Sequence, residues 1–166
     1  MPRTRNIDSQ RKEPLRLPEA ANHLLEECRM VLPGIQALFG FQLVAVFSQR
    51  FAETLTSTEQ IIHLVAIALV VVAVALVMTP AAYHRQTAPE EVTEEFIVLS
   101  TRLLLRSMLP LALGICLDCY LIAMVILKQK ILSLLLSVIL FILLITLWFL
   151  LPRRQIFHKI ILGRND

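Results

Sequence analysis

Charged residues lie inside otherwise apolar stretches of this chain, where each of them needs a partner. Arg106 and Asp118 both fall within the apolar stretch from Arg102 to Leu127. A charge near the centre of a bilayer costs at least about 2.5–3.5 kcal/mol, so such residues usually face protein or water. Asp118 is a lone carboxylate in this stretch, and it could bind and release a proton or pair with a cation.

The spacing around these two charges indicates a helix with one unusual face. Arg106, Pro110, Gly114 and Asp118 follow one another at steps of four, which places them in a slowly drifting row. That face must meet other helices. A direct pair of Arg106 with Asp118 is not expected, because twelve helical residues span about 18 Å. Asp118 is expected to meet Gln36, Gln42 or a neighbouring subunit instead.

Two sets of residues are the candidate site. Six polar residues could form a buried polar network or an ion or proton path: Arg29, Gln36, Gln42, His84, Arg106 and Asp118. Four further residues are candidate helix breaks, because proline removes a backbone hydrogen bond and glycine loosens the chain: Pro33, Gly34, Pro80 and Pro110.

The first apolar stretch leaves two alternatives open. In one, Pro33 and Gly34 kink a continuous helix, and Gln36 and Gln42 hydrogen-bond to neighbouring helices. In the other, the helix is broken there and exposes its backbone to an ion or proton path.

His63 and the cysteines each allow a structural interpretation and a chemical one. His63 lies near one end of its stretch, where an interfacial histidine with ordinary partners is favoured over a proton relay. Cys116 and Cys119 have a redox or metal spacing, but they lie in a span without nearby histidines and are read as small packing residues. No metal site, cofactor or enzyme motif is expected.

The elements that must position these residues are membrane-spanning helices. The chain of 166 residues is 57% hydrophobic and 17% charged, too apolar for a soluble domain of this size. A bilayer core about 30 Å thick needs roughly 20 apolar helical residues per span. The expected fold class is all-α, a polytopic four-transmembrane-helix bundle with amphipathic flanking helices at both termini. Its parts are a disordered basic N-terminus (1–17), a transmembrane domain (18–152) with spans at about 30–47, 61–79, 98–127 and 131–151, and a basic amphipathic tail (153–166).

Finer details of the helices also follow from the sequence. Thr56 with Glu59, or Ser57 with Gln60, has capping-box spacing before the second span. Alanines in this span recur every seven residues, which favours close helix packing. The third helix is expected to begin near Pro89. The fourth span has few polar residues and is the best lipid-facing candidate.

Positive charges predict the orientation. Twelve of the 16 Lys and Arg residues lie on one side of the predicted spans, with Arg50, Lys128 and Lys130 on the other. Because positive charge is retained in the cytoplasm, both termini are expected there. This distribution argues against a nucleic-acid partner and favours anionic lipids at the cytoplasmic face.

Several segments resemble a known family of small bacterial four-span inner-membrane proteins of uncharacterised function, some of them labelled sodium:proton antiporters. The similarity covers about residues 26–127 and is most specific in LPG-x-Q-x-L-x-GFQ, with MTPAAYHR, STRLLLRSMLPLALG and LDCY further along. It implies a bacterial inner-membrane location. It points to these residues: Arg29, Pro33, Gly34, Gln36, Gly40, Gln42, Pro80, His84, Arg106 and Asp118.

Two functions stay open at this point. The first is a non-enzymatic bundle for assembly or partner scaffolding, whose buried polar groups fix helix register. The second is proton- or cation-coupled transport with Asp118 as the titrating carboxylate, which four spans would perform as at least a dimer. A homo-oligomer or a membrane-protein partner is expected for either function.

Overall fold

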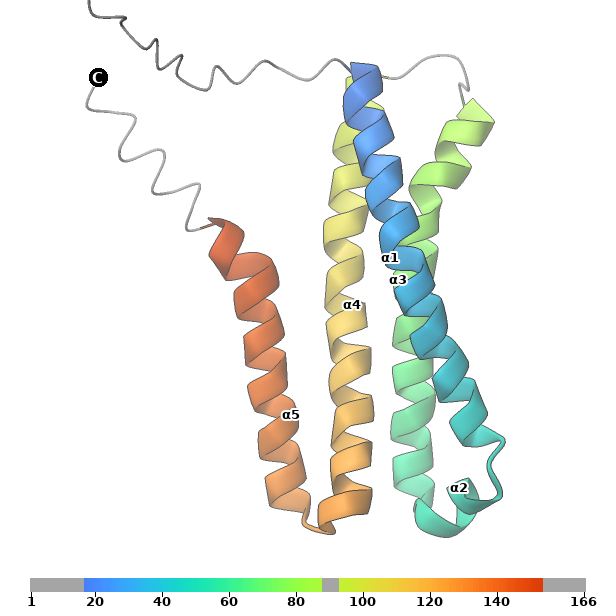
Figure 1. The fold of residues 1–166 in the computed structure, drawn as a ribbon, viewed down its shortest axis with the longest axis vertical. Helices are drawn as coiled ribbons and strands as arrows, with labels where there is room; N and C mark the ends of the chain where they lie inside the picture. The colour runs from blue at the N-terminus through green and yellow to red at the C-terminus, as the bar shows by residue number, and fades with distance from the viewer. Residues whose placement is uncertain (1–16, 88–92, 154–166) are drawn as a thin grey trace, which may run out of the picture.

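The computed structural model describes residues 17–87 and 93–153, and within these ranges the chain is helical with short connections (Figure 1). Four helices are long and apolar enough to cross a membrane, which confirms the expected all-α, four-span architecture. The elements are α1 (Leu17–Val46), α2 (Gln49–Thr54), α3 (Ser57–Thr87), α4 (Glu94–Leu127) and α5 (Lys130–Ile145), which continues into the π-helical turn η1 (Thr146–Leu150). The predicted disordered N-terminus (1–17) and basic tail (153–166) lie outside the described residues, apart from Leu17 and Arg153.

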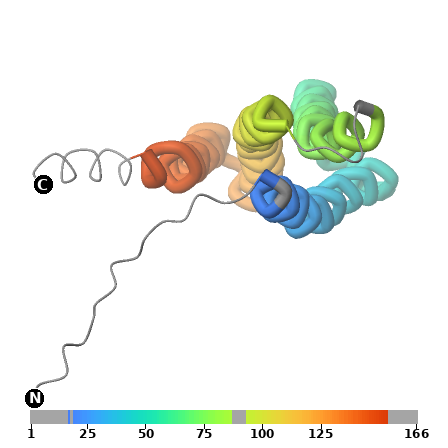
Figure 2. The backbone as a smooth tube through the Cα atoms, turned by 90° about the horizontal axis from the view of Figure 1, so that it is seen from above, coloured from blue at the N-terminus to red at the C-terminus, as the bar shows by residue number. Residues whose placement is uncertain are grey.

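Helices α1, α3 and α4 form the packed part of the bundle. The contact between α3 and α4 is the most extensive, and α1 lies against both of them. Helix α5 packs chiefly on α4 and stands to one side of the other three (Figures 1 and 2). Its outward residues, such as Leu134, Leu135 and Ile139, are exposed, as expected for a lipid-facing span.

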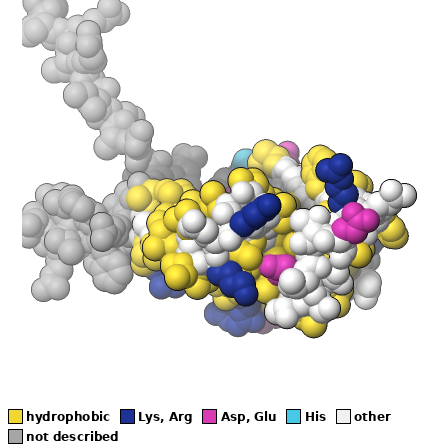
Figure 3. All heavy atoms as spheres, turned by 90° about the horizontal axis from the view of Figure 1, so that it is seen from below, with side chains coloured by type: hydrophobic (Ala, Val, Ile, Leu, Met, Phe, Trp, Pro, Cys, Tyr) yellow, Lys and Arg dark blue, Asp and Glu magenta, His cyan; other side chains and the backbone are white. Residues whose placement is uncertain are grey.

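The two ends of the bundle differ in their connections. At one end, here called the hairpin end, α2 joins α1 to α3, and Lys128 with Gln129 joins α4 to α5 (Figure 1). Seen from this end, basic and acidic side chains are scattered among polar and hydrophobic ones (Figure 3). The other end, here called the terminal end, holds the start of α1 and the end of η1.

Small side chains bring α3 and α4 together. Ala66, Val70, Ala73 and Val77 are buried along one face of α3, at alternating steps of four and three. This confirms the close packing that the Ala66–Ala73 repeat predicts, because small residues let helix backbones approach. The other alanines of the repeat, at 68, 75 and 82, lie on the exposed side.

The prolines do not interrupt their helices, which corrects the helix breaks expected from the sequence. Helix α1 continues through Pro33 and Gly34, α3 continues through Pro80, and α4 continues through Pro110. A proline removes one backbone hydrogen bond, but the remaining bonds of a membrane helix have no water to replace them, so the helix continues past it. The broken-helix alternative for the first span is therefore wrong.

The helix starts follow capping side chains. Before α3, the Glu59 carboxylate accepts hydrogen bonds from the Thr56 backbone N–H and hydroxyl, both at 2.8 Å, so the expected Thr56–Glu59 capping box is confirmed. Helix α4 begins at Glu94 rather than near Pro89. The reason is that the Thr93 hydroxyl caps it by accepting a hydrogen bond from the Phe96 N–H.

Candidate functional site

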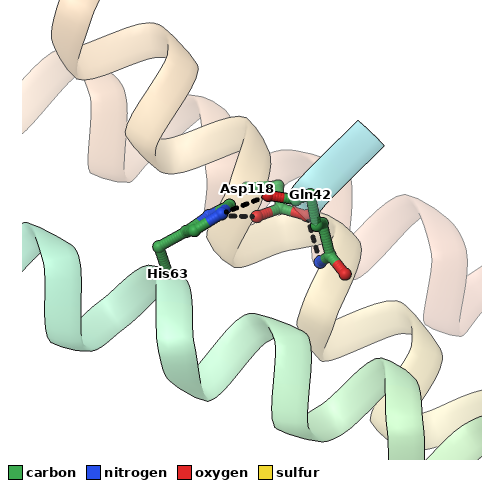
Figure 4. Close-up of polar contacts among 3 residues, drawn as sticks. All are labelled: Gln42, His63 and Asp118. Atoms are coloured by element: carbon green, nitrogen blue, oxygen red, sulfur yellow. Dashed lines mark hydrogen bonds and ion pairs between the residues drawn. The ribbon is translucent and has the colours of Figure 1, made fainter. Parts of the chain in front are cut away.

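Three polar side chains from three different helices, two of them buried and one partly buried, meet near the hairpin end. They are Gln42 of α1, His63 of α3 and Asp118 of α4, here called the polar cluster (Figure 4). Gln42 Nε2 donates a hydrogen bond of 2.6 Å to Asp118 Oδ2. His63 Nδ1 lies 3.2 Å from Asp118 Oδ1, within ion-pair distance when the imidazole is protonated. The carboxylate is thus held from two sides.

His63 also ties α3 to the backbone of α1. Its Nε2 lies 3.1 Å from the Gln42 carbonyl oxygen, at hydrogen-bonding distance when that nitrogen carries the proton. The Phe51 ring of α2 lies over the imidazole, with ring centroids 5.3 Å apart. Each imidazole nitrogen therefore faces an oxygen, and α2 covers the ring on its water side.

The polar cluster has more buried acceptors than donors. Gln42 is only 3% exposed, and its Oε1 has no hydrogen-bond partner among the described residues. Asp118 Oδ1 is also buried without an aligned donor, although His63 Nδ1 lies near it. An unpaired buried acceptor costs about 1–3 kcal/mol, so a purely structural network would be expected to pair both oxygens.

A cavity of about 390 Å³ opens beside the polar cluster. Gln42, His63 and Asp118 form part of its wall, and residues of α1, α2 and α4 supply the rest. The wall is mostly apolar, with Phe41 and Ile126 exposed at its rim and Arg50 contributed by α2. A mostly apolar cavity of this size with a few convergent polar groups is typical of a small-molecule site.

The structure brings together only two of the six residues that the sequence singled out. Gln42 and Asp118 meet, as one of the stated options for Asp118 required. Arg29, Gln36 and Arg106 are exposed on the outside of the bundle. His84 is half-buried near the terminal end, with its ring centroid 5.3 Å from that of Phe96, far along the helices from the polar cluster.

Drift around α4 explains the position of Arg106. Steps of four turn slightly more than a full helical turn, so residues twelve apart do not share a face. Gly114 and Asp118 face α3, whereas Arg106 three turns earlier is exposed. Arg106 also lies about 30 Å along the axis from Leu127, so it falls near the opposite boundary of the hydrocarbon core.

His63 is the member of the cluster that sequence reasoning left out of the candidate site. Its side chain is buried, at 6% exposure, against α1 and α4. One signal could have found it: His63 lies six residues into α3, and Asp118 lies nine residues from the end of α4, so both fall at similar depth from the hairpin end.

The cysteines do not form a metal centre with their neighbours. Cys28, Cys116 and Cys119 are free thiols, and the backbone oxygen of Cys116 accepts a hydrogen bond from Ser137 of α5. Within residues 17–87 and 93–153, no group of three or more His, Cys, Asp or Glu side chains is placed to hold a metal ion.

The chain matches a known protein family over a range that contains the whole polar cluster. Residues 12–152 match the family of unknown function DUF6328. The chain belongs to this family. The DUF6328 match extends over all four long helices and every residue of the cavity wall. No curated protein and no solved structure matches the chain.

Proposed function

We propose that this DUF6328 protein is a non-enzymatic, multi-pass membrane protein that moves protons or cations, with Asp118 as the group that binds and releases them. One observation carries the proposal: the Asp118 carboxylate lies 3.2 Å from the His63 imidazole, and both residues form part of the wall of the cavity. Intramembrane ionisable residues of this kind commonly mark ion paths and proton relays. His63 supplies a second group that can accept the proton.

The unpaired acceptors favour transport over a purely structural role. Gln42 Oε1 and Asp118 Oδ1 are buried without a hydrogen-bond donor among the described residues, and both residues form part of the cavity wall. A proton carried by water, or a cation, would satisfy both oxygens when it binds. An occupied and an empty state of the same site are what a transport cycle needs.

The proposed setting is the bacterial cytoplasmic membrane with both termini in the cytoplasm, supported by the excess of Lys and Arg at the terminal end and by the resemblance noted above. The hairpin end and its cavity then face outward. Asp118 lies about 13 Å along α4 from Leu127, almost halfway through the hydrocarbon core. Four spans are few for alternating access, so the active form is proposed to be at least a dimer.

The test is proton flux in vesicles containing purified protein, measured under imposed pH and sodium gradients. Asp118→Asn removes the charge and nearly preserves the shape, and it is expected to abolish flux. Glu95→Gln is the matched control, because it neutralises an exposed carboxylate at the other end of the same helix. Absence of flux in the parent protein, with its fold verified, would overturn the proposal.

A second candidate function is assembly or partner scaffolding. The observation that favours it is that Asp118 joins α4 to α1 and α3, so the polar cluster also fixes the register of three helices. The basic cytoplasmic side would then recruit anionic lipid or a membrane-protein partner. This function predicts that Asp118→Asn disturbs folding or oligomeric state; unchanged size-exclusion and thermal-unfolding profiles would contradict it.

A further inference from the structure

We propose that the cavity binds a lipophilic amine, a molecule with an apolar body and a protonated amino group, which takes the place of the proton held by Asp118 and His63. This inference rests on the proposed proton-binding role of Asp118 and adds the chemical class of the exchanged ligand. The cavity has a polar wall and an apolar wall.

The polar wall selects a hydrogen-bond donor with positive charge. Two acceptors of this wall, Gln42 Oε1 and Asp118 Oδ1, have no hydrogen-bond donor among the described residues, although His63 Nδ1 lies 3.2 Å from Oδ1. One N–H of the Gln42 amide already donates to Asp118. An ammonium group has three donors and no acceptor, and charge-assisted hydrogen bonds to a carboxylate are the strong ones. A carboxylate or phosphate ligand would be repelled by the Asp118 carboxylate in the cavity wall.

The apolar wall selects a hydrocarbon or aromatic body. Leu38 and Phe41 of α1 face the cavity together with Leu121, Ile122 and Val125 of α4. Phe41 is 75% exposed and Ile122 is 58% exposed on the outer surface of the helices, where lipid would surround them. The rim of the cavity is therefore apolar on the membrane side, which suits a ligand that enters from the bilayer.

The cavity wall also contains a basic side chain. Arg50 is exposed on α2 at the hairpin end, where water screens its charge. From α1, the group that faces Asp118 is the uncharged Gln42, and from α3 it is His63. The carboxylate is the acidic group in the part of the wall that the structure describes, so it is the group that an ammonium would seek.

The exchange conserves charge. In the proposed exchange, Asp118 and His63 share one proton before the amine enters. When R–NH3⁺ enters, that proton leaves to water, and carboxylate, neutral imidazole and ammonium remain. One positive charge enters and one proton leaves, so the net charge of the site is unchanged. No bond to carbon is made or broken.

The test is a calorimetric titration of the protein in phosphatidylcholine nanodiscs, with the heat of empty nanodiscs subtracted. Four probes share one phenylbutyl body: 4-phenylbutylamine, its trimethylammonium derivative, 4-phenylbutanol and 4-phenylbutyrate. The amine is expected to bind at least about tenfold more tightly than the anion and the alcohol, because only the amine supplies charge together with donors. Titrations in two buffers of different ionisation enthalpy should show release of a proton on binding.

Variants locate the site. Asp118→Asn is expected to weaken the amine at least about 30-fold, because one partner of a buried charge pair is removed. Ala45→Phe fills the cavity without changing a charge and should also abolish binding, so the test does not depend on one variant folding. Glu95→Gln should leave the affinity unchanged.

Equal affinity for the amine and the anion, or full affinity in both Asp118→Asn and Ala45→Phe, would overturn the inference. Its failure is distinguishable from failure of the proposed function. If proton flux depends on Asp118 but 4-phenylbutylamine does not bind, only the ligand class is wrong. If the parent protein shows no flux, the proton-binding role itself is lost.

Discussion

Gly114 of α4 lies so close to Val70 of α3 that a methyl group on Gly114 would be 3.0 Å from Val70 Cγ2 and 3.2 Å from the backbone oxygen of Ala66. The second neighbour is backbone and cannot rotate away. The absence of a side chain at Gly114 therefore sets the distance between the two helices, one turn from Asp118.

Gly114→Ala is expected to destabilise the protein by about 1–3 kcal/mol, because overpacking forces the helices apart. The same shift should separate His63 from Asp118 and reduce proton flux. Gly40→Ala is the matched control, since nothing lies within 4 Å of a methyl group there. The control should be neutral or stabilising by up to about 1 kcal/mol through helix propensity. Unfolding in an SDS titration measures both; equal losses in the two variants would contradict the packing argument.

Ser137→Ala should loosen α5 from α4. The Ser137 hydroxyl donates a 2.7 Å hydrogen bond to the backbone oxygen of Cys116 on α4, and bonds of this kind in membranes contribute about 0.6–1.7 kcal/mol. Ser133→Ala is the control, because its hydroxyl bonds to Gln129 just before its own helix. Fluorescence of the single tryptophan, Trp148, during SDS titration reports the loss. A larger loss of stability in Ser133→Ala than in Ser137→Ala would show that the hydrogen bond between α5 and α4 contributes less to stability than the bond from Ser133 to Gln129.

Lys128→Gly is expected to stabilise the α4–α5 turn by about 0.5–1 kcal/mol. Lys128 has φ 54° and ψ 23°, a left-handed conformation in which a side chain costs energy and glycine does not. Thermal unfolding followed by circular dichroism measures the change. Lys130, two residues later, is helical, so Lys130→Gly should destabilise the protein instead. Stabilisation by both substitutions would point to removal of charge rather than to backbone conformation.

His63→Gln should slow proton flux by at least about tenfold, within the range by which positioned acid–base groups act. Glutamine can still hydrogen-bond to Asp118, but it cannot carry the proton. The readout is flux in vesicles, with Asp118→Asn and the parent protein measured beside it. Parent-like flux in His63→Gln would show that Asp118 acts without the imidazole.

The architecture could be predicted because its causes are local in the sequence. Apolar length determines the spans, the Thr56–Glu59 spacing determines where α3 begins, and the small residues at 66 and 73 mark the side of α3 that packs. Each of these depends on a few neighbouring residues and on the bilayer.

The site could be predicted only in part because it depends on how helices are rotated against one another. Asp118 and Gln42 stand out as polar groups in apolar sequence, but Arg106 and Gln36 stand out equally, and these two are exposed. Rotation of α3 around its axis, fixed by packing at Val70 and Gly114, decides that His63 turns inward. Local spacing does place His63 on the packed side of α3, three residues before Ala66 and seven before Val70, but it does not show which side chains of α1 and α4 it meets.

The two-residue connection between α4 and α5 also has a consequence for biosynthesis. With only Lys128 and Gln129 between them, the two helices must enter the bilayer as one antiparallel unit. Helix α4 carries Arg106 and Asp118, whereas after Lys130 at its start the polar side chains of α5 are hydroxyls that bond to backbone oxygens. The favourable transfer of α5 into lipid therefore offsets the cost of inserting the charges of α4. During synthesis at the translocon, α5 acts as the insertion partner of the helix that carries the site.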